Sequence, residues 1–274
     1  MPSDQEVRFR SLDGLDLVGD LAVPDGSAEL GVVQVHGGGV TRHEAGFFDR
    51  MAAGLADAGV AALRFDLRGH GESGGNQEDL TIAAVLNDIR SAFAFLREAT
   101  GVGRTALVGQ SFGGGICAYY AASRPKDVDR LVMLCPRINY KRRTIDDRPY
   151  WVDDHLQPDQ ARELEDRGFI QYSPTFRHGR AFLNEVFWLQ PHTVLSDIQA
   201  PTLVVHGTAD TLVPIDTTLA AMPLLNSASR LLKIEGAQHG FAVDGDPTYL
   251  NPQSQEWQAQ VIRAVADWVT VPPG

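Results

Sequence analysis

The stretch ALVGQSFGGGI, residues 106–116, passes from an apolar segment into a cluster of glycines, with Ser111 between two of them. An unbroken apolar segment favours a buried strand, and the residues after the glycines favour a helix. The run GQSFG therefore fits the G-x-S-x-G pattern of a nucleophile on a sharp strand-to-helix turn, where small neighbours tolerate a strained serine. A turn that merely contains a serine is the alternative. The nucleophile interpretation needs partners elsewhere in the chain.

A serine hydroxyl is a weak nucleophile at neutral pH, so it needs a histidine to take its proton and an acid to orient that histidine. His239 lies in KIEGAQHGF, in the loop after the last expected strand. Asp210, in VVHGTADTLVP, follows a buried strand and lies between the serine and the histidine in chain order. Asp66 is the rival acid, but it precedes the serine and suits a structural role in the turn DLRGHGES. We predict Ser111, Asp210 and His239 as the catalytic residues.

The tetrahedral intermediate of acyl transfer carries negative charge, and N–H donors must already point at it. Phe112 would supply one donor from the start of the helix after the serine. Gly38, in the HGGG run after the apolar segment GVVQVH, would supply the second, because glycine lets the backbone approach a ligand closely. A flexible turn is the alternative for this run. His36, His70 and His206 are interpreted as structural.

Apolar strands alternate with amphipathic helices along most of the chain. Two β-type segments joined through Asp13-Gly14 come first and suggest a hairpin. Further strands are expected at 31–36, 60–66, 105–110, 130–136, 200–207 and 229–236, and helices at 47–59, 80–99, 216–225 and 257–269. This alternation indicates an α/β fold with a doubly wound, mostly parallel sheet covered on both faces.

The alternation stops between residues 137 and 198, which hold four prolines, several aromatic residues and two short helical patches. This segment is too long for a passive connection, so a cap or lid is favoured over a disordered linker. Its aromatic residues, such as Tyr140, Trp151 and Trp188, would line an apolar acyl pocket or fill the core of the cap itself. The basic run 137–148 could face an anionic ligand, although such runs are most often solvated.

The composition excludes several classes of protein. The 274 residues are 43% hydrophobic and 22% charged, which is typical of a globular chain, and no apolar run approaches the roughly 20 residues of a membrane helix. A net charge of −11 argues against a nucleic-acid partner. The first residues lack the pattern of a secretory signal, so a cytoplasmic protein is expected. The oligomeric state stays open, a homodimer included.

No cofactor and no metal are expected, because neither metal-ligand spacing nor a phosphate-binding glycine loop is present in the sequence. Cys117 and Cys135 are interpreted as buried free thiols. The expected partner is a small-molecule acyl substrate.

The motifs HGGG, FDLRGHGES, GQSFGG, VVHGTADTLVP and EGAQHGF follow one another in the order typical of the α/β-hydrolase superfamily. The chain resembles that superfamily over essentially its full length, and it is most similar to capped esterases of the cinnamoyl or feruloyl type. This resemblance implies a sheet of about eight strands with a cap inserted after the sixth. The core would comprise residues 1–136 and 199–274, and the cap residues 137–198.

The sequence departs from those esterases at two positions. They usually carry a bulkier residue where Gly38 stands and a glutamine or methionine where Phe112 stands. The HGGG run resembles hormone-sensitive-lipase-like esterases instead, yet these usually have an aspartate where Gln110 stands. The resemblance therefore supports the fold and the triad more firmly than any substrate.

The resemblance and the triad together predict a serine hydrolase that cleaves a small to medium, apolar or aromatic acyl ester through an acyl-enzyme. Four other enzyme classes would use the same residues. A thioesterase or an amidase would act on another leaving group, and an acyltransferase or a cyclase would transfer the acyl group to an acceptor other than water. A non-catalytic binding protein on the same fold is a further alternative.

Overall fold

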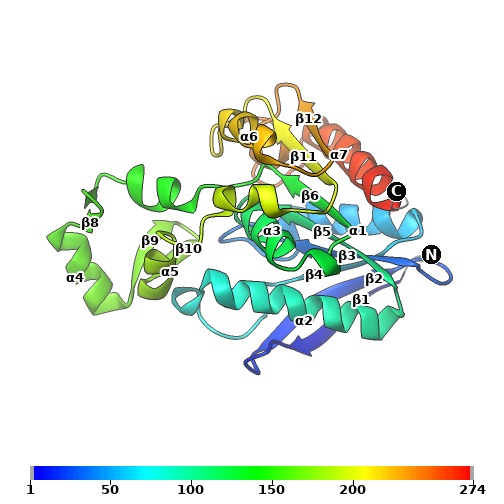
Figure 1. The fold of residues 1–274 in the computed structure, drawn as a ribbon, viewed down its shortest axis with the longest axis horizontal. Helices are drawn as coiled ribbons and strands as arrows, with labels where there is room; N and C mark the ends of the chain where they lie inside the picture. Colours follow the sequence, from blue (N-terminus) through cyan, green and yellow to red (C-terminus); the bar gives the residue numbers. More distant parts are fainter. Residues whose placement is uncertain (1–2, 272–274) are drawn as a thin grey trace.

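A computed structural model describes residues 3–271 and shows a central sheet of eight strands in the order β1-β2-β4-β3-β5-β6-β11-β12 (Figure 1). β2 pairs antiparallel with β1 and β4, and the other pairings are parallel. The mostly parallel sheet predicted from the apolar segments is therefore confirmed. Its strands are β1 (Ser3–Arg10), β2 (Asp16–Val23), β3 (Leu30–Val35), β4 (Ala61–Phe65), β5 (Arg104–Gln110), β6 (Arg130–Leu134), β11 (Thr202–Gly207) and β12 (Ser229–Ile234).

The predicted hairpin joins β1 and β2. Gly14 has a φ of +85°, a left-handed conformation that glycine adopts without strain, and its N–H donates to the Ser11 carbonyl over 3.0 Å. The register places Arg10 opposite Asp16.

Helices cover both faces of the sheet, as the alternation predicted. The buried residues form two apolar clusters, one containing residues of α1 and α7 and the other residues of α2 and α3. The side chain of Thr81 caps α2 by accepting the Ala84 N–H, and Gly101 ends that helix in a left-handed conformation. The helices of this core are α1 (Phe47–Asp57), α2 (Ile82–Thr100), α3 (Phe112–Ser123), α6 (Ile215–Ala221) and α7 (Pro252–Thr270).

Residues 137–198, which we call the cap segment, lie between β6 and β11 in the chain and extend to the left of the sheet in Figure 1. The two predicted helical patches form α4 and α5. Two short hairpins accompany them, which the sequence analysis did not predict. The elements are β7 (Trp151–Val152), β8 (His155–Leu156), α4 (Pro158–Arg167), β9 (Phe169–Ser173), β10 (Phe176–Gly179) and α5 (Arg180–Glu185).

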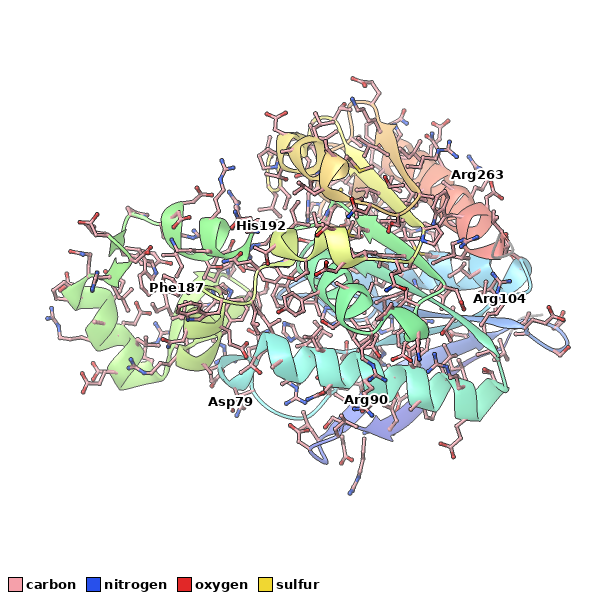
Figure 2. All side chains as sticks on the ribbon, in the orientation of Figure 1. Asp79, Arg90, Arg104, Phe187, His192 and Arg263 are labelled. Carbon is pink, nitrogen blue, oxygen red and sulfur yellow. The ribbon has the colours of Figure 1, made fainter. Side chains whose placement is uncertain are left out.

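Hydrogen bonds join the cap segment to the loop before α2. The Gln77 side chain donates to the Thr175 carbonyl over 3.0 Å and accepts the Arg177 N–H over 3.1 Å. Glu185 accepts the N–H of Ile82 at the start of α2. Figure 2 shows Phe187 within the cap segment and Asp79 at the end of α2 that faces it. The cap segment is thus attached at the same end of the sheet as the predicted site.

Within residues 3–271, none of the helices has the length and apolar character needed to cross a membrane.

Candidate active site

Ser111 occupies the predicted strand-to-helix turn, between the end of β5 and the start of α3. Its backbone angles, φ +53° and ψ −115°, are ones that residues with a side chain rarely adopt. The glycines on either side are needed because space is short: a Cβ on Gly109 would lie 2.5 Å from Cys117 Sγ, and one on Gly113 would lie 2.4 Å from the Val35 carbonyl oxygen. The close packing holds the serine in this strained geometry at the carboxyl edge of the sheet.

Asp210 and His239 meet at the same edge, in the loops that follow β11 and β12. The His239 Nδ1 lies 2.7 Å from Asp210 Oδ2. The other carboxylate oxygen of Asp210 accepts the N–H groups of Leu212 and Val213 over 2.9 and 2.8 Å. The Asp210 side chain is fully buried, and that of His239 is 19% exposed. With its Nδ1–H bonded to the carboxylate, the imidazole has Nε2 free to accept a proton.

His206 is a second histidine beside Asp210. Its Nε2 lies 2.8 Å from the Val213 carbonyl oxygen and 3.4 Å from Asp210 Oδ2, and its Nδ1 lies 2.8 Å from Thr218 Oγ1. Burial alone would raise the pKa of Asp210, but the hydrogen bonds from His206 and His239 outweigh it and hold that pKa well below its usual range. The acid therefore stays ionised, and the predicted structural role of His206 fits these contacts.

The Ser111 side chain faces a cavity of about 110 Å³, which Leu212 and Val213 of the Asp210 loop also line. Among residues 3–271 the serine hydroxyl has no hydrogen-bond partner, His239 included. Catalytic hydrogen bonds in unliganded enzymes are often long and tighten when substrate binds. The structure thus brings Asp210 and His239 into contact and places the Asp210 loop against the wall of the serine's cavity.

The HGGG loop after β3 leaves one N–H group available. The Gly37 N–H donates to Glu44 Oε1 over 2.6 Å, and the Gly39 N–H donates to His70 Nε2 over 3.1 Å. The Gly38 N–H has no acceptor in the described part of the chain. Gly38 lines the cavity beside Ser111, which places this free donor next to the proposed nucleophile.

Phe112 provides a second free donor. As the first residue of α3, its N–H has no partner within the helix. Phe112 also lines the cavity, and its side chain is buried. Free N–H groups on two sides of one small cavity are the arrangement that an oxyanion requires.

Glu44 was not singled out from the sequence, yet its carboxylate lies directly beneath the HGGG loop. It accepts the Gly37 N–H and, on its other oxygen, the Gln110 side-chain N–H over 3.2 Å. Burial raises the pKa of Glu44 to about 7, although the Gly37 N–H opposes that shift. Glu44 and Ala45 have φ values of +45° and +51°, so the backbone is strained to bring this carboxyl group under the loop. An acid in a loop carries no sequence signal for such a position.

The contacts of Asp66 support the structural role predicted for it. Its carboxylate is fully buried and accepts the backbone N–H of Arg42 over 2.7 Å, the Arg42 guanidinium over 2.5 Å and the Glu72 N–H over 2.9 Å. Nearby, His36 Nε2 accepts the Leu67 N–H over 2.9 Å, and burial lowers the pKa of His36 to about 3. His36 therefore stays neutral and braces the loop, as expected of a structural histidine.

The cap segment contributes Tyr172 and Phe176 to the cavity beside Ser111. A Cβ on Gly38 would lie 2.5 Å from the Phe176 ring. The ring thus fills the space that a bulkier residue at position 38 would need. This contact gives a physical reason for the departure at position 38.

The three cap aromatics named from the sequence do not line this cavity. Tyr140 is fully buried and donates to the Phe112 carbonyl over 2.6 Å, so it supports the turn from beneath. Trp151 is half-buried and lines a different hollow. The Trp188 side chain is 83% exposed. Composition indicated an aromatic cap, but it could not separate side chains that face the nucleophile from those that pack the cap or face solvent.

Both cysteines are free and buried, as predicted. Cys135 lies beside the acid: its Sγ and ligand atoms of Asp210 and His239 all lie within 4.8 Å of one another. Burial raises the pKa of the Cys135 thiol well above its usual range, and Asp210 adds to that shift. Asp210 Oδ2 and His239 Nδ1 are hydrogen-bonded to each other, so these two atoms orient the imidazole.

Comparison with known proteins identifies the fold. Residues 32–163 match a family model described as the alpha/beta hydrolase fold. Lipase LipV of Mycobacterium tuberculosis is 36% identical over 142 residues, which cover 51% of this chain and 50% of that protein. The monoacylglycerol lipase of Mycolicibacterium smegmatis is 29% identical over 135 residues, 49% of this chain and 47% of that protein. The matches thus span about half the length of these relatives.

Among solved structures, Est1E from Butyrivibrio proteoclasticus, with ferulic acid bound, superposes with a TM-score of 0.79 at 20% identity. The superposition covers 97% of this chain and all of Est1E, so the shared fold extends through the cap segment. The chain therefore has the α/β-hydrolase fold, and about half of its sequence is similar to the two lipases.

Proposed function

We propose that this chain is a serine hydrolase that cleaves a small acyl ester through an acyl-enzyme. Ser111 is the nucleophile, His239 the general base and acid, and Asp210 the group that orients His239. The N–H groups of Gly38 and Phe112 form the oxyanion hole. Residues 137–198 act as a cap that closes the acyl site.

In the first half of the reaction, His239 Nε2 takes the Ser111 hydroxyl proton as Oγ bonds to the ester carbonyl carbon. The carbonyl electron pair moves onto oxygen, and the two N–H groups stabilise that charge. The tetrahedral intermediate collapses, its carbon–oxygen bond to the alcohol breaks, and His239 returns the proton to the leaving alcohol. The acyl group remains on Ser111.

In the second half, water replaces the alcohol. His239 takes a proton from water as the water oxygen bonds to the acyl carbon, and the second tetrahedral intermediate releases the free acid and regenerates Ser111. Asp210 stays ionised throughout, because its carboxylate is stabilised by two backbone N–H groups and two histidines.

The contact between Asp210 and His239 supports this proposal most directly, since 29 residues separate them in the chain and nothing in the local sequence requires them to meet. The same loop borders the cavity of a serine held in a strained turn. A binding protein would have no need of that strain or of an oriented imidazole.

Active-site labelling with a fluorophosphonate tests the proposal. The wild-type protein is expected to react rapidly and to carry the label on Ser111, as shown by peptide mass spectrometry. Ser111→Ala serves as the matched control and is expected to stay unlabelled while it remains folded. A wild-type protein that is folded but unreactive would contradict the proposal.

A further inference from the structure

Arg137, the first residue of the cap segment, lies beside the cavity of Ser111 and is only 6% exposed. Its Nη2 donates to Thr144 Oγ1 over 2.5 Å. Neither Nε nor Nη1 has a hydrogen-bond partner among residues 3–271. A guanidinium has five N–H donors, and buried donors are normally satisfied. Arg137 is therefore a buried cation with unused hydrogen-bonding capacity.

The charge of Arg137 is not neutralised by the protein. Within the described residues, no carboxylate forms an ion pair with Arg137. Two cations act on Arg137: Arg143, whose partner is Asp147 at 3.4 Å, and Arg148, whose guanidinium carbon lies 4.2 Å from the centre of the Tyr172 ring. Burial and the two neighbouring arginines all lower the pKa of Arg137. Both effects disfavour the charged form of Arg137.

Aromatic rings shelter this cation only in part. The guanidinium carbon lies 5.7 Å from the centre of the Tyr140 ring and 5.0 Å from that of Tyr172. A cation–π contact offsets only part of the free-energy cost of burying an ion. Burial alone would raise the pKa of Tyr172, but the arginines lower it. The arginines around Tyr172 thus make this side of the cavity positive.

Carboxylates are absent from the described lining of the inner cavity beside Ser111, whose charged members are Arg137 and Arg143. A second cavity of about 280 Å³ shares Arg137, Arg143 and Val213 with it, and its wall does include Asp147 and Asp216. The wall of the second cavity also holds Arg142, so its two carboxylates offset the positive charge there only in part, whereas among residues 3–271 no carboxylate lines the cavity beside Ser111. The chain as a whole has a net charge of −11, so the overall balance does not account for this cluster.

We propose that the substrate of this site is a half-ester of a dicarboxylic acid, an ester whose acyl group ends in a free carboxylate that pairs with Arg137. This inference rests on the proposed serine hydrolase and specifies its substrate class. The carbonyl would lie at Ser111, between Gly38 and Phe112, and the carboxylate at the cap side of the inner cavity. A carboxylate matches the planar fork of a guanidinium, and its single charge suits one uncompensated cation. The small inner cavity favours a short acyl chain.

Matched pairs of substrates test this inference in the wild-type protein. The 4-nitrophenyl half-esters of succinic, glutaric and adipic acid are compared with the 4-nitrophenyl esters of butanoic, pentanoic and hexanoic acid. At least one half-ester is expected to exceed its neutral partner in kcat/KM by about tenfold or more, because hydrogen bonds to charged groups contribute about that factor. Because Arg137 is buried, the preference should persist in 0.5 M salt. A neutral ester preferred at all three lengths would overturn the inference and leave the hydrolase in place.

Substitution then assigns the preference to one side chain. Arg137→Met is expected to bring the ratio of kcat/KM between the two esters close to one. It should also fold, since it removes an uncompensated buried charge while keeping the chain volume. Arg162→Gln on α4 removes the same charge from an exposed position that lines neither cavity, and it should keep the wild-type ratio. A ratio that changes in Arg162→Gln as much as in Arg137→Met would contradict a role for Arg137.

A binding measurement separates this inference from the proposed chemistry. Calorimetric titration of Ser111→Ala with monomethyl esters of the three diacids needs no turnover. Binding that is at least about tenfold tighter than that of the matching neutral methyl ester, and that is lost in Ser111→Ala/Arg137→Met, would support the carboxylate subsite even if Ser111 failed to react with a fluorophosphonate. Equal affinity for charged and neutral esters would overturn it.

Discussion

Arg137 lines the cavity beside Ser111, and the loop of Asp210 borders the same cavity through Leu212 and Val213. Both charged side chains are buried, but their charges are compensated to different degrees. Asp210, on the core side, has two backbone N–H groups and two histidines around its carboxylate. Arg137, on the cap side, has one hydroxyl and no counter-ion among residues 3–271. The protein itself compensates the charge on the core side, and on the cap side it does not. Under the proposed function, the core preorganises the chemistry and the cap selects the substrate.

The largest expected effect comes from breaking the core side. Asp210→Asn should lower kcat by roughly 10⁴-fold, because an amide no longer holds His239 in the tautomer that accepts the serine proton. The fold should persist, since the amide oxygen can still accept from Leu212 and Val213. Steady-state kinetics with the preferred ester and circular dichroism measure the two quantities.

Asp66→Asn is the matched control for that substitution. It breaks a buried pair with Arg42, which keeps Asp20 and Glu72 as partners, so it should lower the free energy of unfolding by about 1–3 kcal/mol. Any folded fraction should keep its turnover per active site, as titrated with a fluorophosphonate. If Asp210→Asn kept nearly wild-type turnover while Asp66→Asn folded but was inactive, Asp66 would be the acid that orients His239, and Asp210 would be structural.

The second effect concerns the acid beneath the HGGG loop. The pKa of Glu44 is about 7 in the fold and near 4.5 in the unfolded chain, so the folded state holds the extra proton between these values. Stability from this group is therefore lost as pH rises from about 4.5 to about 7. Glu44→Gln removes the titration, and its amide can pair with Gln110, whose Oε1 has no partner in the described structure.

Chemical denaturation at pH 5 and pH 8 measures this effect. The stability of Glu44→Gln relative to wild type should increase by about 2–3 kcal/mol between the two values. A difference that stays constant, or one that decreases with pH, would show that Glu44 does not titrate there.

The third effect concerns the contact between Gly38 of the core and Phe176 of the cap segment. Gly38→Ala should destabilise the protein by about 1–3 kcal/mol, because its Cβ would overlap the Phe176 ring, and it should also lower kcat by displacing the loop. In the Phe176→Ala background the same change should cost much less. A double-mutant cycle on unfolding free energies measures this coupling, expected at about 0.5–3 kcal/mol. Strict additivity would contradict the packing described here.

The smallest effect is expected at Trp188, which belongs to the cap segment but faces solvent. Trp188→Ser should change the free energy of unfolding by less than about 0.5 kcal/mol. The value of kcat/KM for the preferred ester should equal that of the wild type. A loss of tenfold or more in kcat/KM would mean that this side chain reaches the substrate.

The sequence predicted the core side well because its signals are local. Apolar runs of five to eight residues indicated the strands. Gly109 and Gly113 indicated the tight strand-to-helix turn at Ser111, where the structure leaves no room for a Cβ atom. Asp210 and His239 could be chosen because parallel strands end at one edge of the sheet, so loops that follow them must converge. The contact between the two side chains agrees with that choice.

The cap side and the support beneath the loop were not predictable in the same way. Glu44 reaches the HGGG loop only because its backbone takes an unusual positive φ, and no pattern encodes that. Tyr172 and Phe176 face the cavity because the β9–β10 hairpin turns them inward, whereas aromatic content alone pointed equally to Trp188. The basic run 137–148 was visible in the sequence, but whether Arg137 has a counter-ion depends on which acids the fold brings near.

The central claim is that Ser111, Gly38 and Phe112 surround one reacting carbon while Asp210 holds His239 in place. A crystal structure of the protein inactivated by a small alkyl phosphonate tests it directly. Phosphorus is expected to be bonded to Ser111 Oγ, with one phosphonyl oxygen within about 3 Å of the Gly38 and Phe112 N–H groups and His239 Nε2 facing Oγ. Phosphorus on another residue, or a phosphonyl oxygen turned away from both N–H groups, would contradict the account.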